Sequence, residues 1–97
     1  MSKLPLLNLL SSINEYGTPL NIGKVNNSSI NLIKVKGNIT WHFHPDRDKM
    51  LVVIKGEFKL FLDDREIILH PQEGLIIPRG VLHSGSADTE AWVFMVG

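Results

Sequence analysis

Short apolar runs, rich in isoleucine, valine and leucine, follow one another from residue 20 to the end of the sequence. No segment keeps a sustained helical period, and apolar runs of roughly four to eight residues bounded by turn residues are typical of β-strands. The pattern predicts nine strands, at Leu20–Val25, Ser29–Lys36, Ile39–Phe43, Met50–Ile54, Glu57–Leu62, Glu66–Leu69, Gly74–Ile77, Leu82–Ser84 and Ala91–Val96.

The residues between these runs have ordinary turn chemistry, in which Gly, Asn, Asp, Ser and Pro are favoured. The predicted turns include Asn26-Asn27, Gly37-Asn38, Lys55-Gly56, Asp63-Asp64, Pro71-Gln72 and Ser86-Ala87-Asp88. Strands this closely spaced leave no room for the helical crossovers that connect parallel strands. We therefore predict an all-β fold, an antiparallel sandwich or jelly-roll barrel.

The run MLVVI, residues 50 to 54, is equally apolar at its odd and even positions. A strand with one face in water alternates between apolar and polar residues, so this strand is expected to be covered on both faces. In a domain this thin, the second cover is either the N-terminal arm or another copy of the chain. We expect a homodimer.

With 97 residues, the chain has the length of one small domain, which buries only about 60–65% of its unfolded surface. Its ten basic and ten acidic side chains cancel, and the sequence has no basic run. Strong binding to a nucleic-acid backbone or to an anionic membrane therefore has little electrostatic basis. We expect a small-molecule ligand or substrate, and neither nucleic acid nor membrane, as the partner.

The N-terminal segment MSKLPLLNLL resembles a weak signal peptide, but Pro5 and Asn8 interrupt its apolar stretch and no small-residue cleavage site follows. The stretch is also far shorter than the ~20 residues that span a bilayer. We interpret residues 1–19 as a docking arm of a cytoplasmic protein and residues 20–97 as the barrel domain. The sequence contains no cysteine, so any metal must be held by histidine, carboxylate or water.

Three of the four histidines could meet in one cavity. Side chains two residues apart on a strand share a face, so His42 and His44 project together while Trp41 and Phe43 point the other way. His83 closes the segment PRGVLH, where a turn would direct it back into the barrel. Three neutral imidazoles in an apolar pocket would suit Zn, Fe, Mn, Ni or Cu. The alternative is that the His-x-His pair is merely hydrogen-bonded or exposed.

Two segments carry a family resemblance. GNITWHFHPDRDKMLVVIKGEF resembles the first motif of the cupins, and GLIIPRGVLHSGSA resembles the second. The similarity is strongest to small single-domain cupins likened to mannose-6-phosphate isomerase, and it runs from Asn8 to the final strand. It implies a jelly-roll barrel, metal ligation by His42, His44 and His83, and isomerase or dioxygenase chemistry on a small molecule.

The sequence departs from this family at one important position, because Lys49 stands where the cupin motif has a glutamate ligand. A protonated lysine has no lone pair to donate to a metal. Asp48 could supply the carboxylate if the strand bulges there. Alternatively, the three histidines and water could hold the metal alone. In the remaining case no metal binds, and Lys49 and the histidines form a cationic pocket for a small anion.

Two classes of function follow. In the first, the chain is a metalloenzyme in which a divalent transition metal (Zn, Fe, Mn or Ni) lies beside a small substrate. In the second, it is a binding or sensing module that holds a small anion or sugar without turnover. The sequence contains neither a serine, histidine and acid arrangement for hydrolysis nor a glycine loop for phosphates, so neither hydrolase triads nor nucleotide binding is expected.

Overall fold

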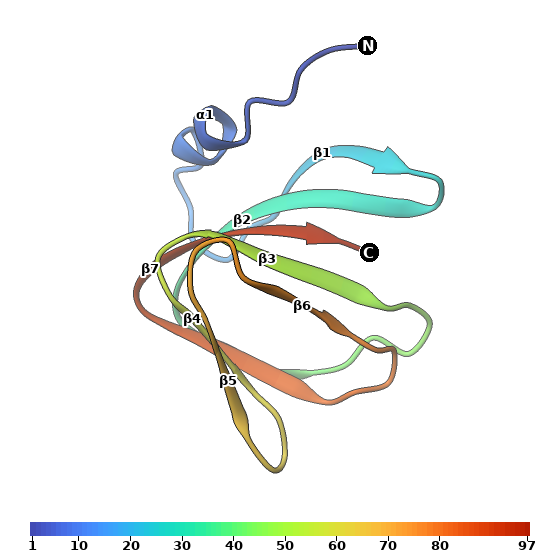
Figure 1. The fold of residues 1–97 in the computed structure, drawn as a ribbon, viewed down its shortest axis with the longest axis vertical. Coiled ribbons are helices and arrows are strands. Elements are labelled where there is room, and N and C mark those ends of the chain that lie inside the picture. Colours follow the sequence, from blue (N-terminus) through green and yellow to red (C-terminus); the bar gives the residue numbers. More distant parts are fainter.

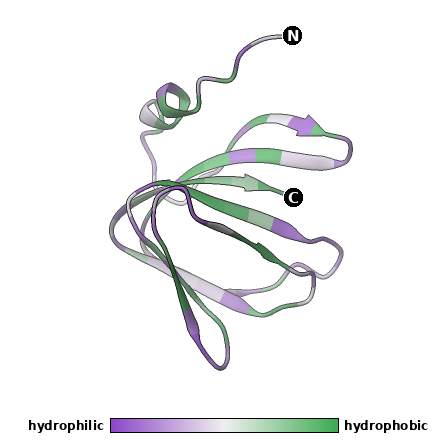
Figure 2. Ribbon diagram, in the orientation of Figure 1, coloured by the Kyte–Doolittle hydropathy of each residue, from purple (hydrophilic) through white to green (hydrophobic).

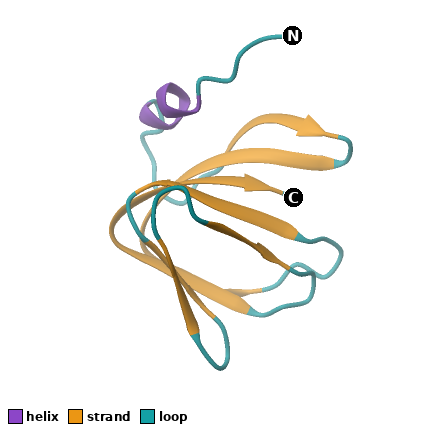
Figure 3. Cartoon of the chain, viewed as in Figure 1, coloured by secondary structure: helices purple, strands orange, loops and turns teal.

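A computed structural model describes all residues, 1–97, as antiparallel strands and one short helix (Figures 1 and 3). The elements are α1 (Leu6–Ser11), β1 (Leu20–Val25), β2 (Ser28–His42), β3 (Lys49–Lys55), β4 (Phe58–Phe61), β5 (Glu66–Leu69), β6 (Gly74–Ile77) and β7 (His83–Val96). The all-β prediction is confirmed, and the arrangement is that of a jelly-roll barrel preceded by a short arm.

The sheet has the strand order β1-β2-β7-β3-β6, with the β4–β5 hairpin attached to β7. Strand β7 joins the two parts of the barrel because its two halves have different neighbours. Its C-terminal half, including Val93 and Met95, pairs with β3, and its N-terminal half, around Gly85, pairs with β4. Strand β2 follows β7 along both halves, which closes one wall of the barrel (Figure 1).

The prediction of nine strands is wrong, because two predicted turns lie inside long strands. Strand β2 continues through Gly37, where its register with β7 shifts and the backbone has φ 81°. Strand β7 continues through Ser86 and Ala87, and Ala87 pairs directly with Gly37. A bulge of this kind bends a strand without ending it. Residues with turn chemistry therefore mark the bend of the wall at both positions.

The main hydrophobic core fills the barrel interior, where the side chains of Val53, Leu60, Ala91 and Val93 are at most 2% exposed. On β3 the alternation is regular, since Leu51 and Val53 point into this core. Strands β3 and β6 are coloured hydrophobic over most of their length (Figure 2). This interior also contains a cavity.

The N-terminal arm covers part of the outer face of the sheet. Leu10 of α1 is fully buried with Leu32 and Trp92, and Ile54 of β3 packs against this second cluster. Three hydrogen bonds fix the arm, from Lys34 Nζ to the carbonyl of Ile13, from the Gly17 N–H to the carbonyl of Lys34, and from Tyr16 to Glu90. The one helix, α1, has six residues and is too short to cross a bilayer.

Candidate metal-binding site in the barrel

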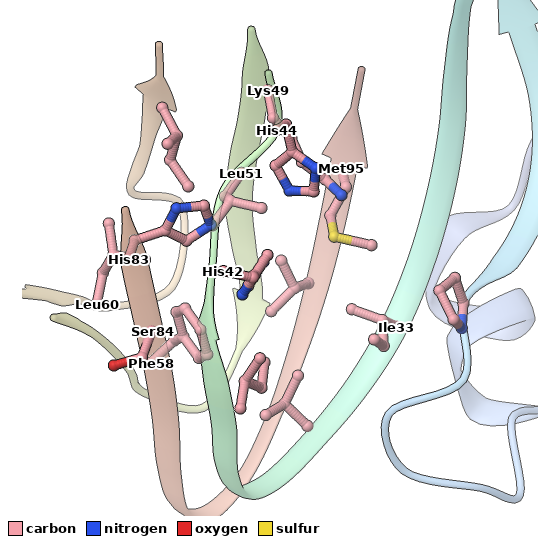
Figure 4. A pocket seen from close by; sticks show the side chains of 16 residues that line it. Ile33, His42, His44, Lys49, Leu51, Phe58, Leu60, His83, Ser84 and Met95 are labelled. Atoms are coloured by element: carbon pink, nitrogen blue, oxygen red, sulfur yellow. The ribbon is translucent and has the colours of Figure 1, made fainter. Parts of the chain in front are cut away.

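Three histidines meet at one end of the barrel interior (Figure 4). His42 ends β2 and pairs with His83, the first residue of β7. His44 lies two residues beyond His42, in the loop that leads to β3. The pairing of β2 with β7 therefore brings His42 and His83 together, and the i, i+2 spacing places His44 beside His42.

The three rings are close enough to share one ligand. Ring centroids of His42 and His83 lie 4.3 Å apart, those of His42 and His44 5.1 Å apart, and those of His44 and His83 5.7 Å apart. One potential ligand atom from each ring lies within 4.8 Å of the other two. The three side chains could hold a metal ion, and imidazole nitrogen suits divalent transition metals.

Backbone carbonyls fix the orientation of two of these rings. Nδ1 of His42 lies 2.8 Å from the carbonyl oxygen of Thr40, and Nδ1 of His83 lies 2.8 Å from that of Val81. A carbonyl oxygen only accepts, so each Nδ1 carries the hydrogen and each Nε2 keeps a lone pair. Metal-binding histidines are commonly oriented in this way. In both cases the carbonyl lies two residues before the histidine that it contacts.

The third ring has an unsatisfied atom, because Nε2 of His44 is buried and has no hydrogen-bond partner. A buried polar atom without a partner is costly, so the site fits an occupant such as a metal ion. Arg47 Nη2 lies 3.4 Å from the other ring nitrogen, Nδ1, at the outer limit of a hydrogen bond. That weak contact does little to determine which nitrogen carries the proton.

Burial favours the neutral form, which metal binding needs, in two of these rings, His44 and His83. The pKa of His44 is lowered by burial first and then by the charges of Lys49 and Arg47. The pKa of His83 is also lowered, again mainly by burial, although its hydrogen bond to the Val81 carbonyl acts in the opposite direction. A neutral imidazole offers a lone pair near neutral pH, whereas a protonated one does not.

The histidines line a cavity of about 160 Å³ whose other walls are mainly apolar. Lys49, the first residue of β3, is half-buried and lines the same cavity (Figure 4). The apolar lining residues are Pro19, Ile33, Val35, Ile39, Leu51, Phe58, Leu60, Ile77, Val93 and Met95. Sequence reasoning did not single out these walls, although the alternation of Ile33 with Val35 on β2 indicates which positions face inward.

Asp48 is engaged away from this cavity. Its Oδ1 accepts a hydrogen bond of 2.9 Å from the backbone N–H of Arg79. A second bond, from the N–H of Gly80 to the carbonyl of His44, joins the same two segments at 2.8 Å. The loop that carries His44 is thus tied to the turn that precedes His83. Asp48 contributes to the placement of both segments, and its carboxylate is not among the groups that line the cavity.

Comparison with known proteins agrees with this fold. The family model described as Cupin domain matches residues 31–96. The Bacillus subtilis protein YdbB is 33% identical over 85 residues, covering 86% of this chain and 75% of YdbB. A cupin-2 domain containing protein from Shewanella frigidimarina has a TM-score of 0.94 at 29% identity, covering 97% of this chain and 92% of that one. A cupin superfamily protein from Desulfitobacterium hafniense, with a TM-score of 0.79 at 19% identity over 98% of this chain and 88% of that one, shares the fold. The chain belongs to the cupin family.

Proposed function

We propose that this cupin binds a divalent transition metal (Zn, Fe, Mn or Ni) through His42, His44 and His83 and holds a small molecule beside it. The convergence of three imidazoles carries the proposal, since their potential ligand atoms lie within 4.8 Å of one another. The unpartnered Nε2 of His44 supports it further. When bound, such an ion polarises an oxygen of a coordinated ligand, which suits isomerase or dioxygenase chemistry.

The protein's own residues set limits on that chemistry. No aspartate or glutamate lines the cavity, so no carboxylate is placed there as a general base. The other walls are mainly apolar and leave Lys49 as the only ionisable side chain besides the histidines. The chain's contribution is therefore to bind and orient a small molecule close to the imidazoles.

Metal titration of the untagged protein tests this proposal, because a histidine tag would bring metal of its own. Zn²⁺ and Fe²⁺ should bind the wild-type protein tightly, and His44→Ala should weaken that binding strongly while the fold is retained. Loss of the ring also removes the buried unpaired nitrogen, so the variant should not be less stable in the absence of metal. Equal metal binding by the two proteins would contradict the proposal.

A second candidate function is a metal-free binding module for a small anion or sugar, and the position of Lys49 in the cavity favours it. The Lys49 ammonium group would supply the positive charge that attracts the ligand, a role that the metal ion has in the first proposal. The two candidates differ in their response to a chelator. Ligand-dependent thermal stabilisation that survives removal of metal supports the binding module, whereas stabilisation that disappears supports the metal site.

We also propose that the chain forms a homodimer through the outer face of its sheet. Ile30, Val96, Met50 and Ile76 are successive partners across β2, β7, β3 and β6, so their side chains form one apolar row. Met50 is 41% exposed and Ile76 is 63% exposed. The arm covers Ile54 at one end of β3 but leaves Met50 at the other end exposed.

Sedimentation velocity tests the homodimer. Ile76→Lys places a charge on the most exposed side chain of this apolar row and should yield a monomer. Ile68→Lys, on the β4–β5 hairpin, changes a residue that is 42% exposed outside the row and should remain dimeric. A wild-type protein that sediments as a monomer at high concentration would contradict this assignment.

A further inference from the structure

Lys49 has a cationic side chain inside the cavity and no anionic partner. It lies on the inward face of β3, in the same alternation as Leu51 and Val53. The ion pairs of the protein join Arg47 to Asp46, Lys59 to Asp88, and His70 to Glu57, and none involves Lys49. No side-chain hydrogen bond satisfies its ammonium group either.

An unpaired charge in this position has a cost that a ligand could offset. Burial of Lys49, together with the nearby charge of Arg47, lowers its pKa. Both effects act against the ammonium form, and an anion within contact distance acts in its favour. Because the cavity contains no aspartate or glutamate, that anion must come from outside the protein.

The other residues that line the cavity indicate the chemistry and size of the uncharged part of the ligand. Phe58, Leu60 and Val93 offer only hydrocarbon surface, and Ser84 supplies the one hydroxyl group. A sugar would leave several hydroxyl groups without partners there. The volume of about 160 Å³ is close to that of an engineered cavity of about 150 Å³ that binds benzene. An apolar body of about six heavy atoms therefore fits.

The charge also discriminates among anions. A phosphate dianion is usually held by several donors, such as arginine forks or successive backbone N–H groups. This cavity has one lysine, which matches a single negative charge. We infer that the ligand of this cavity is a small monocarboxylate, an inference that rests on the proposed function of the same cavity. Its carboxylate pairs with Lys49, and its apolar body packs against Phe58, Leu60 and Val93.

The test compares matched charged and neutral probes on the untagged protein, both metal-loaded and chelator-treated. Acetate, isobutyrate, hexanoate, the neutral isostere isobutyramide and inorganic phosphate are titrated by calorimetry and by thermal shift. Isobutyrate should bind and stabilise the protein, and isobutyramide should bind roughly tenfold to a hundredfold more weakly, the range for a hydrogen bond to a charged group. This comparison needs no variant.

Two variants then locate the effect. Lys49→Met keeps an unbranched apolar stem, removes the ammonium group and should lose most of the preference for isobutyrate over isobutyramide. Lys49→Arg keeps the charge and should retain the preference. Metal content should be unchanged in both variants, because Lys49 is not a ligand.

The outcomes separate this inference from the metal proposal. Discrimination between isobutyrate and isobutyramide in a protein that binds no metal would overturn the metal site and support the carboxylate inference. A protein that binds metal but binds isobutyrate and isobutyramide equally well would support the metal site and overturn the carboxylate inference. Tighter binding of phosphate than of any carboxylate, no binding of any carboxylate in the series, or an unchanged preference in Lys49→Met would each overturn the inference.

Discussion

His42 and His83 face each other across the β2–β7 ladder, with ring centroids 4.3 Å apart. The pairing fixes two rings from distant parts of the sequence before any ligand is bound. Such preorganisation reduces the ordering that a metal site must otherwise impose. His83 should therefore contribute as much to metal binding as His42 and His44 do.

We predict that His83→Ala lowers Zn²⁺ affinity by more than about a hundredfold, which exceeds the usual effect of losing a residue that only orients a ligand. Competition with a chromogenic chelator measures the affinity. His70→Ala is the matched control, because His70 is exposed and faces Glu57 at a distance of 3.5 Å. An equal loss in both variants would indicate metal binding at the surface.

Leu10 and Leu7 lie on the same helix but in opposite surroundings, since Leu10 is fully buried and Leu7 is 57% exposed. Leu10→Ala should lower the free energy of unfolding by about 2–5 kcal/mol, because it empties the space against Leu32 and Trp92. Leu7→Ala should change it by no more than about 0.5 kcal/mol. Urea denaturation measures both values, and equal effects would mean that the arm does not dock as described.

Gly56 and Gly37 have nearly the same positive φ, 83° and 81°. Alanine at either position should cost about 1–2 kcal/mol for the left-handed conformation alone. At Gly56 the added methyl group would also overlap the carbonyl oxygen of Glu90, whereas at Gly37 it meets open space. Gly56→Ala should therefore destabilise the protein by about 1–3 kcal/mol more than Gly37→Ala in the same urea assay. A difference near zero would contradict the close approach at Gly56.

Glu90 accepts hydrogen bonds from Tyr16 and from Trp92 Nε1, and these bonds hold its pKa below the usual value. The stabilising contribution of its carboxylate is thus present above the pKa of the unfolded chain and is lost as pH falls through the lower folded-state pKa. The stability difference between the wild-type protein and Glu90→Gln should shrink from about pH 6 to about pH 3. Urea midpoints across this range measure it, and a difference independent of pH would count against the mechanism.

The sequence was sufficient for most of the fold because apolar runs and turn residues act locally. β1, β5 and β6 have the predicted bounds. The bends at Gly37 and Ala87 were mistaken for turns, because their strand state depends on pairing between residues that are distant in the sequence. Local turn chemistry could not indicate that each residue has the other as its partner.

The candidate site was predictable to a similar extent. The i, i+2 spacing places His42 and His44 on one side, and the resemblance to the cupins indicated His83. The engagement of Asp48 by the backbone of Arg79 could not be predicted, since it depends on how two loops meet in space. The same is true of the buried, unpartnered Nε2 of His44.

The metal content of untagged protein, purified without chelator and then loaded with Zn²⁺ or Fe²⁺, tests the central claim most directly. Elemental analysis after extensive dialysis should find close to one transition-metal ion per chain in the wild-type protein. The His42→Ala, His44→Ala and His83→Ala variants should each retain almost none. Wild-type protein that retains no more metal than these variants would contradict a metal site formed by the three histidines.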